Sequence, residues 1–148
     1  MRVAIGSDHA GFELKEYLAE ELIKEGYDIN NLGTFNSEPV DYPDFGVKIA
    51  DAIISGDCEL GIAICGTGIG ITIAANKKSG IRAAACSETY SAKMARAHNN
   101  ANVIGIGARV VGQGLALEIA LAFLQTKFEA GSRHEMRVNK INSIENNK

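Results

Sequence analysis

The sequence predicts an α/β fold: a doubly wound, five-stranded parallel sheet with helices on both faces. Two observations predict it. Apolar segments typical of strands alternate five times with amphipathic segments typical of helices, and most connections between them are short. The chain has 148 residues, 46% of them hydrophobic, which is enough for one core. We therefore expect residues 1–148 to form a single domain.

Hydrophobic patterning sets the order of the elements. The expected strands are RVAIGS (2–7), YDINNLG (27–33), LGIAIC (60–65), IRAAAC (81–86) and NVIGIGA (102–108). LGIAIC is almost continuously apolar, as a parallel strand buried on both faces should be. The expected helices lie at about 11–25, from Phe45 to Ile53, at 71–78, at 88–97 and from Leu115 to Phe123.

The C-terminal segment departs from this alternation. SRHEMRVNKINSIENNK (132–148) is polar and compatible with a helix, but it is too weakly apolar to be core. We expect a helical arm from about residue 133 to 148, which is either a solvated tail or a segment that packs on a partner chain.

Charge and cysteine content exclude several classes of function. The net charge of −3 gives no basic field for nucleic acid or an anionic membrane. No apolar stretch approaches the length of a membrane span, and the N-terminus does not resemble a signal peptide, so we expect a cytoplasmic protein. Cys58, Cys65 and Cys86 form no CxxC pair, which argues against both a disulfide framework and a zinc ribbon.

Ligands of doubly wound sheets bind outside the carboxyl ends of the strands. The loops that we expect there are GSDHAG (6–11), CGTGIG (65–70), CSETY (86–90), HNNAN (98–102) and GARVVG (107–112). The glycine turn would present backbone N–H groups to an anion such as a phosphate or an enediolate. It matches neither the dinucleotide fingerprint GxGxxG nor the P-loop, which needs GK[ST].

Cys65 precedes the helix that follows this turn. The helix dipole and the amides favour thiolate there, so Cys65 is a candidate base or nucleophile; the alternative is a buried, inert thiol. A phosphatase loop of the C-x5-R type is excluded because Ile71 occupies the arginine position. Cys58 and Cys86 have no comparable loop, and we interpret them as structural.

Other candidates also have a plain structural interpretation. Asp8 could cap the first helix, and His98 could cap the helix that ends before it. Arg133 and Arg137 are four residues apart, so with Lys140 they place three cations on one face of a helix. This face could simply be solvated, or it could bind a phosphate together with Arg109.

Six ordered motifs carry a resemblance to a known family. They are GSDHAG, VDYPDF, CGTGIGITIAANK, RAAAC, ARAHNNANVIGIGARVVG and SRHEMRV. From Arg2 to about Val138 the chain closely resembles ribose-5-phosphate isomerase type B, a family that includes galactose-6-phosphate and allose-6-phosphate isomerases. The resemblance implies a Rossmann-like or flavodoxin-like three-layer sandwich. It also implies a homodimer or dimer of dimers with active sites at the subunit boundary, and catalysis without a metal or an organic cofactor.

The resemblance further implies roles for individual residues. Cys65 matches the base that moves a proton between C1 and C2 of the sugar phosphate. The Thr67 hydroxyl and the turn amides match the groups that stabilise the enediolate; these amides belong to Gly66, Thr67, Gly68, Ile69 and Gly70. His98 matches the histidine that opens the furanose ring, and Asp8 matches the acid that assists at the sugar hydroxyls. Further positions match residues that contact substrate: Tyr42 and Asn99 at the sugar, and His9, Arg109, Arg133 and Arg137 at the phosphate.

Another branch of the family uses a glutamate in the helix after the glycine turn. Ile71 stands at that position, so the chain is expected in the cysteine branch. We expect interconversion of ribose 5-phosphate and ribulose 5-phosphate in the pentose phosphate pathway. The alternatives are an isomerase of six-carbon sugar phosphates (allose 6-phosphate or galactose 6-phosphate) and a sugar-phosphate sensor that has lost catalysis.

Overall fold

A computed structural model describes residues 1–145 of the chain. The strands are β1 (Arg2–Ser7), β2 (Asp28–Asn31), β3 (Leu60–Cys65), β4 (Ala83–Ala85) and β5 (Val103–Gly107). The helices are the short 3-10 turn η1 (His9–Gly11), α1 (Phe12–Lys24), α2 (Tyr42–Ile54), α3 (Ile69–Ala75), α4 (Thr89–Ala97), α5 (Gln113–Gln125) and α6 (Arg133–Glu145).

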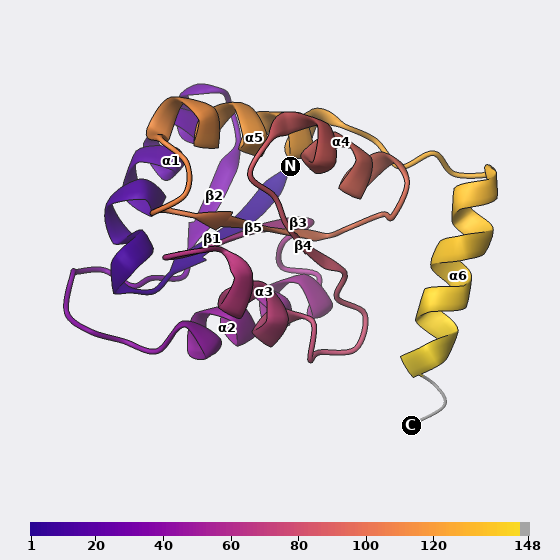
Figure 1. The fold of residues 1–148 in the computed structure, drawn as a ribbon, viewed down its shortest axis with the longest axis horizontal. Helices are drawn as coiled ribbons and strands as arrows, with labels where there is room; N and C mark the ends of the chain where they lie inside the picture. Colours follow the sequence, from indigo (N-terminus) through magenta and orange to yellow (C-terminus); the bar gives the residue numbers. More distant parts are fainter. Residues whose placement is uncertain (146–148) are drawn as a thin grey trace.

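The strands form one five-stranded sheet in the order β2-β1-β3-β5-β4, with every pairing parallel. Helices α1, α4 and α5 cover one face, and α2 and α3 cover the other (Figure 1). The α/β class, the five parallel strands and the C-terminal helix predicted from the sequence are therefore confirmed. Several boundaries differ: β2 and β4 are shorter than expected, and α3 begins two residues earlier.

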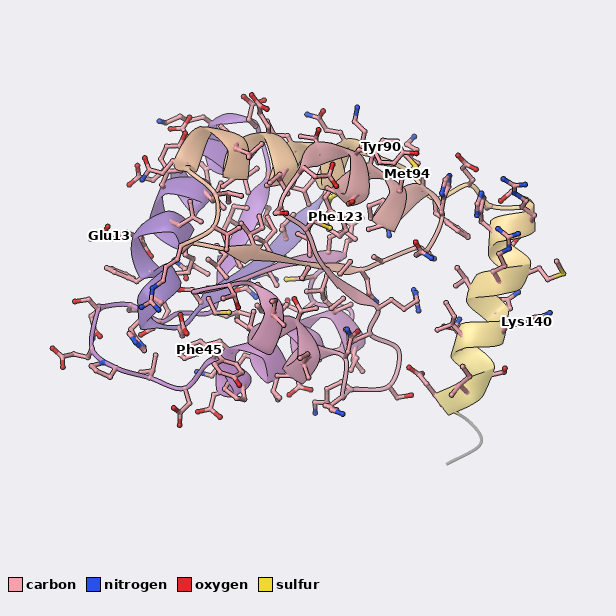
Figure 2. All side chains as sticks on the ribbon, viewed as in Figure 1. Glu13, Phe45, Tyr90, Met94, Phe123 and Lys140 are labelled. Atoms are coloured by element: carbon pink, nitrogen blue, oxygen red, sulfur yellow. The ribbon has the colours of Figure 1, made fainter. Side chains whose placement is uncertain are left out.

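Each face of the sheet has its own apolar core. Leu18, Ile104 and Phe123 belong to the cluster under α1, α4 and α5, whereas Phe45 and Ile71 belong to the cluster under α2 and α3. Phe123 and Phe45 lie on opposite sides of the sheet in Figure 2. The central strands β3 and β5 are buried along their whole length, as the apolar run LGIAIC predicts.

Helix α6 stands beside the sheet rather than on either face (Figure 1). Its buried residues are His134 and Val138, whereas Met136, Ile141 and Ile144 are exposed. The Glu145 carboxylate accepts hydrogen bonds from the Ser79 hydroxyl and the Gly80 amide, at 2.7 and 2.9 Å. The predicted arm is thus a helix to residue 145, and its last three residues lie outside the described part of the chain. No described helix is both long and apolar enough to span a bilayer.

Candidate active site

A cavity of about 410 Å³ opens at the carboxyl edge of the sheet. Its lining residues come from the β1–α1 loop, the start of α2, the β3–α3 turn and the loop after β5: Asp8, His9, Ala10, Tyr42, Cys65, Gly66, Thr67, Ile69, Gly70 and Arg109. The volume suits a small ligand. Nine of these ten residues are candidates predicted from the sequence.

The β3–α3 turn places the Cys65 sulfur at the base of this cavity. Cys65 ends β3 and is 4% exposed, and the Gly68 N–H donates a hydrogen bond to its Sγ at 3.2 Å. The Ile69 N–H donates to Thr67 Oγ1, also at 3.2 Å. Two of the five turn amides are thus engaged within the turn, and one of them points its positive end at the sulfur.

Gly68 has to be glycine for two reasons. Its φ is +76°, and a Cβ built there would lie 2.8 Å from the backbone carbonyl carbon of Ile106. Both the left-handed conformation and the close approach to β5 exclude larger side chains. The glycine therefore fixes the geometry that brings its own N–H to the Cys65 sulfur.

Bare backbone at two other turn positions lets side chains approach the cavity. A Cβ at Gly66 would lie 3.3 Å from Arg109 Nη1, and one at Gly70 would lie 2.7 Å from the Tyr42 ring. The guanidinium and the phenol ring thus rest on the turn. Arg109 brings a positive charge to the same cavity as Cys65.

The β1–α1 loop forms the opposite wall. Asp8 is buried, and its Oδ1 accepts a hydrogen bond from the Gly11 N–H at 3.1 Å, so it does cap the first helical turn. His9 Nδ1 lies 3.2 Å from the Val40 nitrogen and 3.1 Å from its carbonyl oxygen. This contact ties the loop before α2 to the cavity wall.

The other two cysteines differ from Cys65 in their surroundings. Burial raises the pKa of Cys86 to about 11, and burial also raises the pKa of Cys58. Both thiols are therefore protonated at neutral pH, and neither lines the cavity. This agrees with the structural role predicted for them.

The structure corrects one sequence prediction: HNNAN does not lie at the carboxyl edge. The Asn102 carbonyl accepts a hydrogen bond from the Gly61 N–H at 2.9 Å, beside the start of β3. Gly61 and Cys65 are four residues apart along β3, which corresponds to roughly 13 Å of strand. The prediction is wrong because a segment that follows a helix and precedes a parallel strand returns to the amino edge.

His98 therefore lies near the amino edge of the sheet, whereas Cys65 lies at the carboxyl edge. It is the residue that caps α4, its N–H donating to the Met94 carbonyl at 2.9 Å. Its half-exposed ring stacks on His134 of α6, with the centroids 3.9 Å apart and the planes at 4°. Glu129 Oε1 lies 3.9 Å from His98 Nε2.

Two arginines fix the loop that carries His98 and Asn99. Arg82 Nε and Nη2 each donate to the Asn100 carbonyl at 3.0 Å. Arg96 Nη1 donates to Asn100 Oδ1 at 2.9 Å and to the Ala101 carbonyl at 2.7 Å. Burial lowers the pKa of both guanidinium groups, and the Arg82 charge also lowers that of Arg96. These bonds hold Asn100 at its positive φ of 46°.

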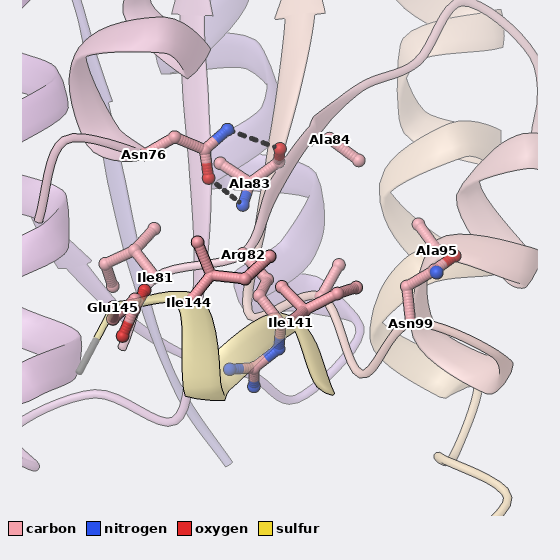
Figure 3. A pocket seen from close by; sticks show the side chains of 11 residues that line it. Asn76, Ile81, Arg82, Ala83, Ala84, Ala95, Asn99, Ile141, Ile144 and Glu145 are labelled. Carbon is pink, nitrogen blue, oxygen red and sulfur yellow. Dashed lines mark hydrogen bonds between the residues drawn. The ribbon is translucent and has the colours of Figure 1, made fainter. Parts of the chain in front are cut away.

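The remaining candidates lie with α6. Asn99 lines a cavity of about 420 Å³ between α6 and the body of the molecule, together with Ile141 and Ile144 (Figure 3). Arg133 and Arg137 are exposed on α6, one helical turn apart. The predicted residues thus fall into two groups, one around the cavity at the carboxyl edge of the sheet and one at the amino edge and on α6.

Sequence reasoning missed the residues that surround His98. His134 lies between the two arginines of the motif SRHEMR. Its place in that motif is the one sequence feature that could have pointed to a role at the site. Glu129 stands in no motif, whereas Arg96 stands two residues before His98 in ARAHNNAN and Arg82 begins RAAAC. The two arginines contact Asn100 and Ala101, which follow His98 in the chain, rather than His98 itself.

Comparison with known sequences finds a family whose members resemble this chain. The profile of the family described as Ribose/Galactose Isomerase matches residues 3–141. The ribose-5-phosphate isomerase B of Escherichia coli (strain K12) is 47% identical over 144 residues, covering 97% of this chain and 96% of that protein.

Solved structures agree with the sequence match. The Clostridium thermocellum ribose-5-phosphate isomerase B is 53% identical, covers 99% of both chains and superposes with a TM-score of 0.97. The ribose-5-phosphate isomerase B from Mycoplasma genitalium, solved with bound ribulose-5-phosphate, is 38% identical with a TM-score of 0.93, covering 99% of this chain and 97% of that one. The likeness extends over nearly the whole chain.

Proposed function

Because this chain belongs to the ribose/galactose isomerase family, we propose that it interconverts ribose 5-phosphate and ribulose 5-phosphate through an enediolate. The observation that carries the proposal is the β3–α3 turn, where a buried cysteine, a hydroxyl and glycine amides line the same cavity as an arginine. Base, oxyanion donors and an anchor for phosphate are the groups that this reaction needs.

Cys65 is the proton-transfer group in this proposal. In the open-chain aldose its thiolate takes the proton from C2, and the electron pair of that C–H bond forms the C1–C2 double bond of the enediolate. The sulfur then returns a proton to C1, while O1 gains the proton that O2 loses. The Gly68 N–H at 3.2 Å stabilises the sulfur in its anionic form.

Charge on the enediolate oxygens is stabilised by donors already in place. The Thr67 hydroxyl and the N–H groups of the turn that face the cavity donate these hydrogen bonds. Asp8 contacts the sugar hydroxyls through the part of its carboxylate that does not cap η1, and Tyr42 contacts the sugar from the other wall. His9 and Arg109 bind the phosphate on this side of the cavity.

The second group of residues has to come from another chain. Within one chain, His98, Asn99, Arg133 and Arg137 cannot reach a ligand beside Cys65, because they lie at the amino edge of the sheet or on α6. We infer a homodimer, or a dimer of dimers, in which the partner's α4 end and α6 complete each cavity. In that arrangement His98 opens the furanose ring, Asn99 contacts the sugar, and Arg133 and Arg137 bind the phosphate.

Turnover tests the reaction and the base together. Purified protein in EDTA should convert ribose 5-phosphate to ribulose 5-phosphate, and Cys65→Ala should lower kcat by about 10²- to 10⁴-fold, the contribution of a positioned base. Cys86→Ala is the matched control, a buried thiol that does not line the cavity, and should keep wild-type turnover. Full activity in Cys65→Ala would move the base to another residue.

Substrate length tests the two alternatives. We expect kcat/KM for ribose 5-phosphate to exceed that for allose 6-phosphate and galactose 6-phosphate. The opposite order would make the chain a six-carbon sugar-phosphate isomerase with the same groups. Binding of all three without turnover would identify a sensor.

A further inference from the structure

The groups around His98 form a contact that the reaction described above does not use. The His98 and His134 rings lie face to face, 3.9 Å apart and 4° from parallel. The Glu129 carboxylate faces both rings, with Oε1 3.9 Å from His98 Nε2 and Oε2 3.7 Å from His134 Nε2. His134 is buried, whereas His98 and Glu129 are half-exposed.

Two histidines and a carboxylate at this spacing also suggest a metal centre. The stacking argues against it. In-plane nitrogen lone pairs of two parallel rings lie in two separate planes and do not converge on one point. An ion midway between these rings would sit far outside both planes, whereas zinc bound by imidazole lies close to the ring plane. The cluster is better suited to hold a ring and a charge than to hold an ion.

The two neighbours of the His98 ring differ in charge. Burial lowers the pKa of His134, and the neighbouring His98 lowers it further, so His134 is neutral at pH 7. A neutral ring against His98 presents a π face to it, and a carboxylate stands at its edge. The carboxylate therefore lies where it can interact with a positive charge that His98 gains during catalysis, and the neutral ring does not repel that charge.

We propose that Glu129 and His134 are positioning residues for ring opening: Glu129 stabilises the positive charge that His98 gains, and His134 holds its ring plane. The inference rests on the ring-opening role of His98 in the proposed function. When the furanose opens, His98 takes the proton from O1, and that electron pair forms the C1–O1 double bond. The C1–O4 bond breaks, and O4 takes a proton from water.

Two substrates separate ring opening from isomerisation. Ribose 5-phosphate is mostly a closed furanose, whereas ribulose 5-phosphate cannot form a five-membered ring because its O5 carries the phosphate. Exchange of the C1 protons of ribulose 5-phosphate with D2O, followed by NMR, therefore reports the Cys65 step alone. Turnover of ribose 5-phosphate reports ring opening as well.

Glu129→Gln keeps the shape and removes the charge. We expect it to lower kcat/KM for ribose 5-phosphate by about fivefold, the range of one partly exposed ion pair, and to leave C1 exchange within about twofold of wild type. Glu129→Asp should recover part of the loss. His134→Phe, which keeps a flat ring, should retain more ribose 5-phosphate turnover than His134→Ala. Glu20→Gln, an exposed carboxylate on α1, is the matched control and should change neither rate.

The outcomes distinguish this inference from the proposed function. Equal losses of turnover and exchange in Glu129→Gln would indicate a general structural defect and overturn the inference, as would wild-type values for both rates. If Cys65→Ala kept C1 exchange, the proposed base would fail instead. If His98→Asn kept full turnover of ribose 5-phosphate, the ring-opening role of His98 would fail and take this inference with it.

Discussion

In the proposed function the two edges of the sheet carry different parts of the chemistry, and they are built in different ways. At the carboxyl edge, Cys65, Thr67 and Gly68 lie within one turn, buried and joined by backbone hydrogen bonds. At the amino edge, His98 is half-exposed and depends on contacts with α6. In the proposed function, proton transfer is thus organised by local sequence, whereas ring opening would depend on segments that meet only after folding and on the inferred assembly of two chains.

Gly68→Ala should disrupt the β3–α3 turn at the carboxyl edge. The new methyl group would meet the backbone of β5 at 2.8 Å, in a left-handed conformation, and would move the N–H away from the Cys65 sulfur. We expect kcat to fall by about 10²- to 10³-fold, as when a preorganised donor is lost. Steady-state turnover and C1 exchange should fall together, because the Cys65 step serves both.

Gly56→Ala is the matched control for this variant. Gly56 also has a positive φ, of 78°, but its added Cβ would meet nothing within 4 Å. It should cost about 1 kcal/mol of unfolding free energy and leave kcat unchanged. A comparable loss of kcat in both variants would show that backbone strain, rather than the approach to β5, explains Gly68→Ala.

Mixing two inactive variants tests whether the two edges cooperate between chains. Cys65→Ala and His98→Asn each damage a different edge, and random reassociation should produce mixed dimers with one intact site. We expect about one quarter of wild-type sites to return for an equimolar mixture, as two-fold symmetry requires. Ribose 5-phosphate turnover before and after reversible dissociation measures this. No recovery, despite mixed dimers detected by mass spectrometry, would place both residues in one chain's site.

Arg96→Met should destabilise the loop after α4 without changing the turn that holds Cys65. It removes the charged hydrogen bonds to Asn100 and Ala101, so we expect a loss of about 2 kcal/mol of unfolding free energy in urea denaturation. Turnover of ribose 5-phosphate should fall severalfold while C1 exchange stays near wild type. Lys93→Met, an exposed change on the same helix, should affect neither.

The smallest expected effect is the pH dependence of stability that the buried Cys86 thiol causes. The pKa of the Cys86 thiol is raised from its ordinary value of 9.0 to about 11 in the folded protein. Above pH 9 the unfolded chain therefore loses this proton while the folded chain keeps it. Stability is therefore lost as the pH rises from about 9 to 11. Between pH 8 and 11 the wild type should lose up to about 2 kcal/mol more than Cys86→Ala. Equal slopes would contradict the burial of this thiol.

The sequence was most informative where function depends on neighbours in the chain. The order of strands and helices followed from apolar periodicity, and Cys65 could be singled out as a candidate because it shares one turn with three glycines. The sequence also contained the information needed to place HNNAN, because a segment between a helix and the next parallel strand belongs at the amino edge. The prediction failed by treating every polar loop as a carboxyl-edge loop.

The contacts of His98 could not be predicted in this way. Glu129 lies more than thirty residues from His98 in the sequence. The two approach because the segment between α5 and α6 passes the end of α4, where the Glu129 N–H donates to the Ala97 carbonyl at 3.0 Å. Arg82 likewise reaches Asn100 from the segment before β4, eighteen residues away in the sequence, whereas Arg96 is only four residues from Asn100. Nothing in a local pattern encodes such distances, because they depend on how the arm packs against the body.

The position of α6 beside the sheet has a kinetic consequence. If each working cavity needs the arm of a second chain, the concentration of active sites at high dilution rises with the square of the chain concentration. Specific activity would then fall on dilution and recover on concentration, and substrate, by bridging the two chains, would slow that fall. The amount of protein present would itself act as a control on flux.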